Sequence, residues 1–150
     1  MTPNPTTDPP IFNLNEDLLW SIFHLNADMF TDQKALETTR LTSQVCSSWR
    51  NLMLAAPSLW GRLIDLDALL RNSADRWGHE LLRRNGEALL WIKSSSIIAE
   101  APLALLLYVL EGSWFRIQRL ALSINSFHFK ANAKIWDKFY LPAPHLQNSK

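Results

Sequence analysis

The residues that could carry chemistry in this chain are few and lie far apart in the sequence. There is one cysteine, Cys46, and there are four histidines, His24, His79, His128 and His145. A local metal site needs such side chains at close spacing, and a nucleophilic cysteine needs an adjacent base. The four glycines form no Gly-rich phosphate loop. The sequence therefore predicts no catalytic residue, no metal site and no cofactor.

Cys46 and one acidic pair have structural explanations that outweigh catalytic ones. Cys46 is expected inside an apolar helix, beside Val45 and Trp49, which is typical of a buried and unreactive cysteine. Glu16 and Asp17 fall in the first turn of an expected helix, where carboxylates favour the positive end of the helix dipole. We assign neither position a role in acid–base chemistry.

Composition narrows the class of protein. The chain has 150 residues, of which 47% are apolar and 19% charged, so it can bury a core. A formal net charge of +1 predicts no attraction to nucleic acid or to an anionic membrane. The single cysteine fits a reducing compartment, and the opening sequence MTPNPTTDPP lacks a signal-peptide pattern. We therefore expect the protein in the cytosol, the nucleus or both.

Two segments could be taken for a membrane or a nucleic-acid site. Residues 101–110 are apolar, but a membrane-spanning helix needs about 20 such residues, and a membrane-surface helix needs a charged face. Burial against strands is the better interpretation of this segment. The basic residues are explained by a solvated helix face, with a nucleic-acid or phosphate-recognition surface as the alternative; they are Arg71, Arg76, Arg83, Arg84, Arg116 and Arg119.

The N-terminal part of the chain predicts three short helices after a proline-rich leader. Residues 1–10 contain four prolines and are expected to be disordered. Pro57 prevents continuation of the third helix and favours a turn that returns Leu59 and Trp60 to the helices. The helices are expected over 15–26, 31–41 and 44–55, with caps from Asn15, from Thr31 or Asp32, and from Ser43.

Apolar residues recur at helical spacing in this part of the chain. Three helices in roughly 50 residues are near the lower limit of independent folding, so they cannot cover every apolar residue themselves. We expect the helices to pack together through Leu19, Phe23, Leu41 and Trp49. The two apolar stripes are Leu14, Leu18, Leu19, Ile22 and Phe23, and then Leu41, Val45, Trp49, Leu52 and Met53.

Three segments, in this order, resemble the signatures of an F-box. Residues 14–23 are similar to its opening helix, usually written Leu-Pro-x-Glu-Leu-Leu-x-x-Ile-Phe, with Asn15 in place of the proline. Residues 41–50 contain the second signature, Val-Cys-x-x-Trp, and residues 56–60 contain the Pro-Ser-Leu-Trp that ends many fungal F-box-like domains. Asparagine can cap the helix where proline would pre-set its backbone, so the contact made at this position is expected to differ.

The resemblance implies a protein without catalytic activity that binds other proteins. An F-box binds a Skp-type adaptor, and through it a cullin, in an SCF-type E3 ubiquitin ligase. The adaptor-binding residues it implies are Leu14, Asn15, Leu18, Leu19, Ile22, Leu41, Val45, Cys46 and Trp49. The F-box core it implies includes Phe23, Leu52, Leu59 and Trp60.

The remainder of the chain alternates between strand-like and helix-like segments. Strands expected to start near Ile64, Leu90, Leu120 and Leu146 recur at roughly 26 to 30 residues, which is close to a leucine-rich-repeat period. This part also resembles the repeat region of basidiomycete F-box proteins, and the solenoid is expected to be incomplete. The expected strands cover 62–66, 88–94 and 119–125, the helices 73–84 and 102–112, and an amphipathic segment 131–140, with Asn85 and Gly86 as a helix stop.

The sequence therefore predicts a mainly α fold, in which a three-helix F-box module precedes a short α/β leucine-rich-repeat-like segment. The expected divisions are a leader (1–10), an F-box-like domain (11–64) and a partial repeat segment (65–150). The expected function is substrate recognition for an SCF-type ligase, with an unspecified protein as the target. Two alternatives stay open: an interaction module or truncated F-box product that binds no adaptor, and a small basic nucleic-acid binder.

Overall fold

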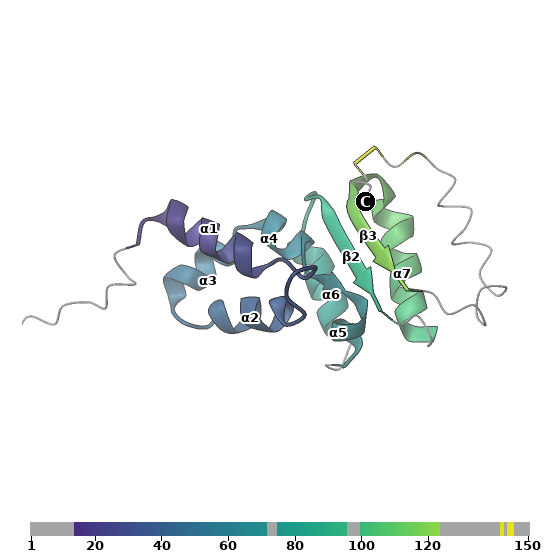
Figure 1. Ribbon diagram of the computed structural model, residues 1–150, viewed down its shortest axis with the longest axis horizontal. Helices are drawn as coiled ribbons and strands as arrows, with labels where there is room; N and C mark the ends of the chain where they lie inside the picture. The colour runs from purple at the N-terminus through teal and green to yellow at the C-terminus, as the bar shows by residue number, and fades with distance from the viewer. Residues whose placement is uncertain (1–13, 72–74, 96–99, 124–141, 143, 146–150) are drawn as a thin grey trace, which may run out of the picture.

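The computed structural model of the protein describes residues 14–71, 75–95, 100–123, 142 and 144–145. The short helices of the N-terminal part lie at one end of the molecule, and a small sheet with its helices lies at the other (Figure 1). The described residues form a mixed fold in which helices predominate, as predicted. The expected leader, the segment 131–140 and the strand near Leu146 lie outside the described residues.

The first helix, α1 (Glu16–Asn26), begins as the sequence predicts. Asn15 is its N-cap, with an extended backbone (φ −68°, ψ 158°), and its Oδ1 accepts the backbone N–H of Leu18 at 2.8 Å. Glu16 and Asp17 occupy the first turn, where they offset the positive end of the helix. The prediction of a capped first helix is confirmed.

The second helix, α2 (Ala35–Thr42), begins later than predicted. Asp32 does not cap it directly, because its carboxylate accepts the backbone N–H of Lys34 at 2.8 Å and holds a turn before the helix. Ser43, expected to cap the following helix, instead donates its hydroxyl to the backbone oxygen of Arg40 at 2.7 Å. The turn at Asp32 therefore lies where a helix was expected, whereas the turn at Ser43 lies in the expected break between the second and third helices.

The third helix, α3 (Ser47–Leu54), is also shorter than predicted. The backbone N–H of Gln44 donates to the oxygen of Leu41 at 2.9 Å, so the chain turns before this helix starts. Cys46 has an extended backbone (φ −154°, ψ 168°), and its Sγ accepts the N–H of Trp49 at 3.5 Å. The expectation that Cys46 lies inside a helix is therefore wrong; it is the N-cap.

A short helix, α4 (Pro57–Gly61), replaces the expected turn and joins the two ends of the molecule. Trp60 is fully buried, and its Nε1 donates to the backbone oxygen of Met53 at 2.8 Å. Gly61 permits a close approach to the sheet, because a Cβ at this position would lie 2.5 Å from the backbone oxygen of Leu89. The backbone of α4 therefore lies directly against the segment that leads into β2.

Within the described residues the strands form one sheet in the order β1-β2-β3, and both pairs are parallel. The register places Asp65 opposite Lys93 and Trp91 opposite Arg119, so these side chains share one face. Ile92 points to the opposite face and is fully buried. The strands are β1 (Ile64–Asp65), β2 (Leu90–Ser94) and β3 (Ile117–Leu122).

This second part contains a short helix that was not expected, directly after β1. The predicted strand over 62–66 shortens to two residues, because the Asp65 carboxylate accepts the N–H groups of Asp67 and Ala68 (3.1 and 3.0 Å) and starts a helix. Gly86, at φ 48°, follows the end of α6, which confirms the predicted stop. The helices are α5 (Leu66–Arg71), α6 (Asp75–Arg84), α7 (Glu100–Ser113) and a 3-10 turn (Trp114–Arg116).

One hydrophobic core extends through both ends of the molecule. Phe23 of α1 and Trp49 of α3 meet edge to face, with ring centroids 5.3 Å apart. The same cluster of buried side chains continues through Leu59, Trp60, Leu63, Ile64, Leu90, Ile92, Leu106, Leu110 and Ile117. The helical part and the sheet are therefore packed as one body.

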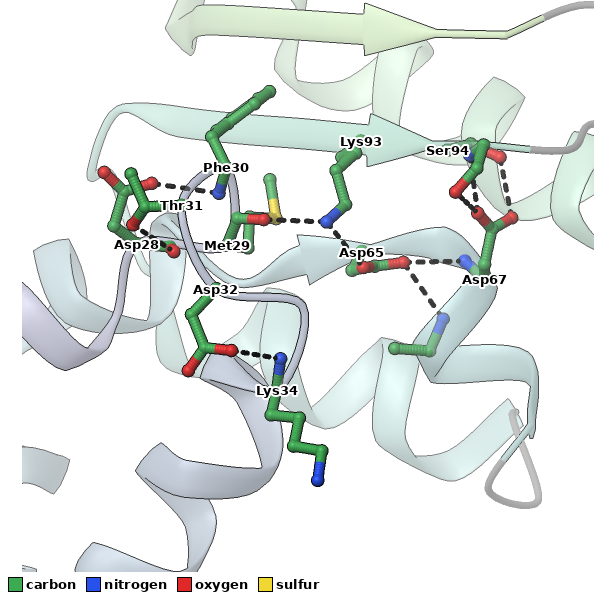
Figure 2. A network of polar contacts seen from close by, with 12 residues as sticks. Asp28, Met29, Phe30, Thr31, Asp32, Lys34, Asp65, Asp67, Lys93 and Ser94 are labelled. Atoms are coloured by element: carbon green, nitrogen blue, oxygen red, sulfur yellow. Dashed lines mark hydrogen bonds and ion pairs between the residues drawn. The ribbon is translucent and has the colours of Figure 1, made fainter.

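Polar contacts attach the loop between α1 and α2 to the sheet (Figure 2). Lys93 Nζ lies 2.7 Å from the backbone oxygen of Met29 and 3.2 Å from Asp65 Oδ2. The Asp67 carboxylate accepts the hydroxyl of Ser94 at 2.8 Å, which connects α5 to the end of β2. Since Asp65 and Lys93 are largely shielded from water, this ion pair holds its geometry better than a surface pair would.

Candidate functional site

Helix α1 carries a stripe of exposed apolar side chains. Leu18, Ile22 and Leu25 are 52%, 40% and 76% exposed, and their spacing of four and three residues places them on one face of the helix. Leu19 and Phe23 lie on the buried side and pack into the core. A helix of eleven residues thus presents apolar surface both to the core and to solvent.

The junction between α2 and α3 exposes two further apolar side chains. Leu41 is 60% exposed and Val45 is 57% exposed. Leu41 was expected to pack the helices together, and this expectation is wrong. It lies at the end of α2, whose buried residues are Ala35, Leu36 and Thr39, so its side chain points away from the core.

The other residues assigned to an adaptor contact differ in exposure. Asn15 is exposed but uses its side chain to cap α1, and Leu14 and Cys46 are half-buried. Leu19 and Trp49 are only 7% and 8% exposed, so they support the exposed face from beneath rather than forming it. Of the residues assigned to an F-box core, Phe23, Leu59 and Trp60 are buried, and Leu52 is partly buried against them.

Two exposed leucines escaped the sequence analysis. Leu25 extends the stripe of Leu18 and Ile22, and its position seven residues after Leu18 is a signal that helical periodicity offers. Leu54, at the end of α3, is 41% exposed. No sequence signal marks Leu54, because its exposure depends on how α3 packs against its neighbours.

The described residues include several side chains of the types that bind metal ions. Among them, no group of three or more His, Cys, Asp and Glu side chains is placed to hold a metal ion. Burial, and to a lesser extent the charge of Arg62, lower the pKa of His24, which favours its neutral form.

Among the described residues, no helix combines the length and the apolar character needed to cross a membrane.

A groove beside α6 and α7 has a volume of about 580 Å³. The rings of His79 and Tyr108 meet edge to face in it, with centroids 5.3 Å apart. Its lining includes Arg83, Glu111 and Arg116 but no cysteine, so it provides no thiol nucleophile. The groove therefore combines several hydrogen-bond donors with one carboxylate.

Three of the arginines that raised the question of nucleic-acid binding, Arg83, Arg84 and Arg116, are paired within the chain. Arg83 and Arg84 both contact the carboxylate of Glu80, at 2.8 and 2.7 Å. Arg116 donates to the backbone oxygen of Gly86 and, at 2.8 Å, to the hydroxyl of Ser113. The side chains of Arg71 and Arg76 lie outside the described residues. Such pairing favours the interpretation of a structured helix surface over a basic patch.

Comparison of the chain with known protein families, curated proteins and solved structures finds no match. The resemblance of residues 14–60 to an F-box therefore stays a prediction. What the geometry provides is an apolar surface on α1 and at the α2–α3 junction, held on a packed core.

Proposed function

We propose that this protein is a substrate-recognition subunit of an SCF-type E3 ubiquitin ligase. In this role the helical part, α1 to α3, binds a Skp-type adaptor, and the part containing the sheet binds a target protein. The chain itself performs no bond chemistry. It holds the lysines of the target close to a ubiquitin-charged enzyme, which raises their effective concentration.

The observation that carries this proposal is the exposure of the residues assigned to the adaptor contact. Leu18 and Ile22 on α1, and Leu41 and Val45 at the next helix junction, all face solvent. Burying apolar surface against a partner is favourable by about 25 cal/mol per Å². A few such side chains at the centre of an interface dominate its affinity. The exposed face therefore suits a partner that is itself apolar at the point of contact.

The arrangement of the sheet supports the second half of the proposal. The strands begin at Ile64, Leu90 and Ile117, so consecutive starts lie 26 and 27 residues apart. Helix α7 links β2 to β3, and the strands follow one another across the sheet in chain order. One strand and one helix per unit is the organisation of a leucine-rich repeat. The link from β2 to β3 fits it, whereas the link from β1 to β2 contains two helices, α5 and α6. We infer that this part is a short leucine-rich-repeat-like array that presents the target.

Co-purification of the full chain with a Skp-type adaptor and a cullin tests the proposal. The double variant Leu18→Asp with Ile22→Asp is expected to abolish binding, because each carboxylate would be buried without a partner at an apolar interface. Both side chains are exposed in the free chain, so the fold is expected to persist. Phe115→Asp is the matched control: Phe115 is exposed on the sheet part, and its change is expected to leave adaptor binding intact.

Each outcome of this experiment has a distinct meaning. Retained adaptor binding by the folded double variant would show that α1 is not the contact face. Failure of the parent chain to bind either adaptor or cullin would overturn the ligase proposal. Circular dichroism of every variant separates loss of binding from loss of fold.

A second candidate is an interaction protein that belongs to no ligase. Asn15 favours it, because this residue caps α1 at the position where an F-box has proline. This candidate would be supported if the folded parent chain binds no adaptor and an Asn15→Pro variant does bind it. The same exposed face would then serve a different protein partner.

A further inference from the structure

Arg119 on β3 lies against two aromatic side chains, in the corner where their rings meet. Its guanidinium carbon is 4.3 Å from the ring centroid of Phe30 and 4.7 Å from that of Trp91. The two rings also meet edge to face, with centroids 5.9 Å apart. Phe30 comes from the loop that lies over β2 (Figure 2), and Trp91 comes from β2 itself. Three segments that are distant in sequence thus fix the position of one guanidinium.

This arrangement leaves the donors of Arg119 available. A guanidinium has five N–H donors, and its attraction to an aromatic ring comes from its charge and does not require these donors to bond elsewhere in the chain. Within the part of the chain that the structure describes, Arg119 makes no hydrogen bond or ion pair, and its side chain is only half-buried. Arg84, by contrast, is paired with Glu80 at 2.7 Å. Arg119 is held in place without being neutralised.

The surroundings of Arg119 have an excess of positive charge. Arg62 lies over the same indole ring, 4.2 Å from its centroid, and donates to the backbone oxygen of His24 at 3.3 Å. Burial lowers the pKa of Arg62; Asp28 raises it, and the charge of Arg119 lowers it further. Lys93 lies on the same face but is paired with Asp65. An anion placed at Arg119 would reduce the repulsion between the two guanidinium groups.

We propose that Arg119 anchors a binding site for an oxyanion, which is either a carboxylate or a phosphate group. The oxyanion binds edge-on to the guanidinium, through paired N–H donors, while Phe30 and Trp91 hold the plane of the group. The site lies on the sheet and not on the apolar stripe of α1. Oxyanion binding and adaptor binding can therefore be tested separately.

Nuclear magnetic resonance of the full chain, with inorganic phosphate and acetate as separate probes at constant ionic strength, tests the site. The Nε–Hε signal of Arg119 is expected to shift and saturate as the probe is added. Arg50 is the internal control, because it is exposed on α3 and its Nε donates to the backbone oxygen of Ser43 at 3.2 Å. Its signal is expected to show no saturation.

Variants separate recognition from general salt effects. Arg119→Gln is expected to abolish saturable binding, and Arg119→Lys, which keeps the charge but loses the planar fork, to weaken it at least about fivefold. Phe30→Leu is expected to weaken binding by removing one face that holds the guanidinium, and the Leu18→Asp with Ile22→Asp variant to bind as the parent does.

The possible results either support the site or remove it. Saturation by phosphate alone supports the site and identifies a phosphate group, whereas saturation by both probes supports it and admits carboxylates. Linear shifts of equal size at Arg119 and Arg50 would overturn the proposal and leave Arg119 as a cover for the two rings. Undiminished binding by Arg119→Gln would overturn it as well.

Discussion

Helix α1 and strand β2 use their apolar residues in opposite ways. α1 buries Leu19 and Phe23 but leaves Leu18, Ile22 and Leu25 exposed. Four of the five residues of β2 are buried, and the fifth, a lysine, is half-buried in an ion pair with β1. The strand has all its contacts within the chain. The helix has a second face whose contacts the described residues do not supply.

The same contrast holds for the two parts of the molecule. Of the nine large apolar side chains that are exposed in the described residues, six lie before Pro57. The three that lie after it, Leu89, Tyr108 and Phe115, are scattered over a loop, α7 and the turn before β3. Apolar residues that are exposed singly are ordinary, whereas a row along one helix indicates a partner. The two parts share one core but have different tasks at the surface.

The largest expected effect is a difference in stability between two leucine-to-alanine variants, one in the sheet part and one in the helical part. Leu90→Ala, in the fully buried start of β2, is expected to lower the free energy of unfolding by about 2–5 kcal/mol, because it leaves a cavity. Leu41→Ala, at an exposed position, is expected to change it by less than about 0.5 kcal/mol. Urea denaturation followed by circular dichroism measures both. Equal losses at the two positions would remove the contrast between the two parts.

The ion pair between β1 and β2 gives the next largest effect. Asp65→Ala is expected to cost about 3 kcal/mol, because it leaves the Lys93 ammonium without its carboxylate and removes the acceptor at the start of α5. Adding Lys93→Met is expected to restore part of this loss, since the unpaired charge is then gone. Asp32→Ala, on an exposed turn, is the control and is expected to cost under about 1 kcal/mol. A double variant less stable than Asp65→Ala alone would contradict the pairing.

A smaller effect is expected at the cap of α1. Asn15→Ala removes the side-chain oxygen that accepts the N–H of Leu18 and is expected to cost about 1 kcal/mol. Asn15→Asp keeps an acceptor and is expected to preserve stability. Asn51→Ala, at an exposed position inside α3, serves as a control that is expected to keep or slightly raise stability, because alanine is the better helix former. Thermal or urea unfolding gives these differences, and a neutral Asn15→Ala would show that α1 is held by packing alone.

The smallest expected effect depends on pH. Hydrogen bonds from Arg83 and Arg84 lower the pKa of the Glu80 carboxyl from 4.5 to about 2. The folded pKa lies below the unfolded value, so the contribution is present above pH 4.5 and is lost as the pH falls toward 2. Because the pair lies at the surface, water and salt limit it to about 0.5 kcal/mol.

A carboxyl titration by nuclear magnetic resonance is expected to place the Glu80 midpoint below 4.5. The stability difference between the parent chain and Glu80→Gln is expected to shrink over the same pH range. A midpoint close to 4.5 would show that the arginines do not hold this carboxylate in solution.

Local signals in the sequence predicted much of the fold. Asn15 before an acidic first turn predicted the start of α1, and Asn85-Gly86 predicted the end of α6. Both predictions depend on the chemistry of adjacent residues, which a sequence displays directly. The start of α3 was missed, because a cysteine took the capping position that Ser43 was expected to fill. α5 was missed because the Asp65 carboxylate ends the strand as well as starting the helix.

The sequence by itself determined which residues are apolar, at what period they recur, and where several helices and strands begin and end. Helical periodicity placed Leu18 and Ile22 in one apolar stripe with Leu19 and Phe23, but it did not reveal that the core covers only the latter two. Only the tertiary structure decided that Leu41 faces solvent and that Phe30 and Trp91 both contact Arg119. The physical reason is that burial depends on contacts between segments far apart in the chain, whereas caps and turns depend on near neighbours.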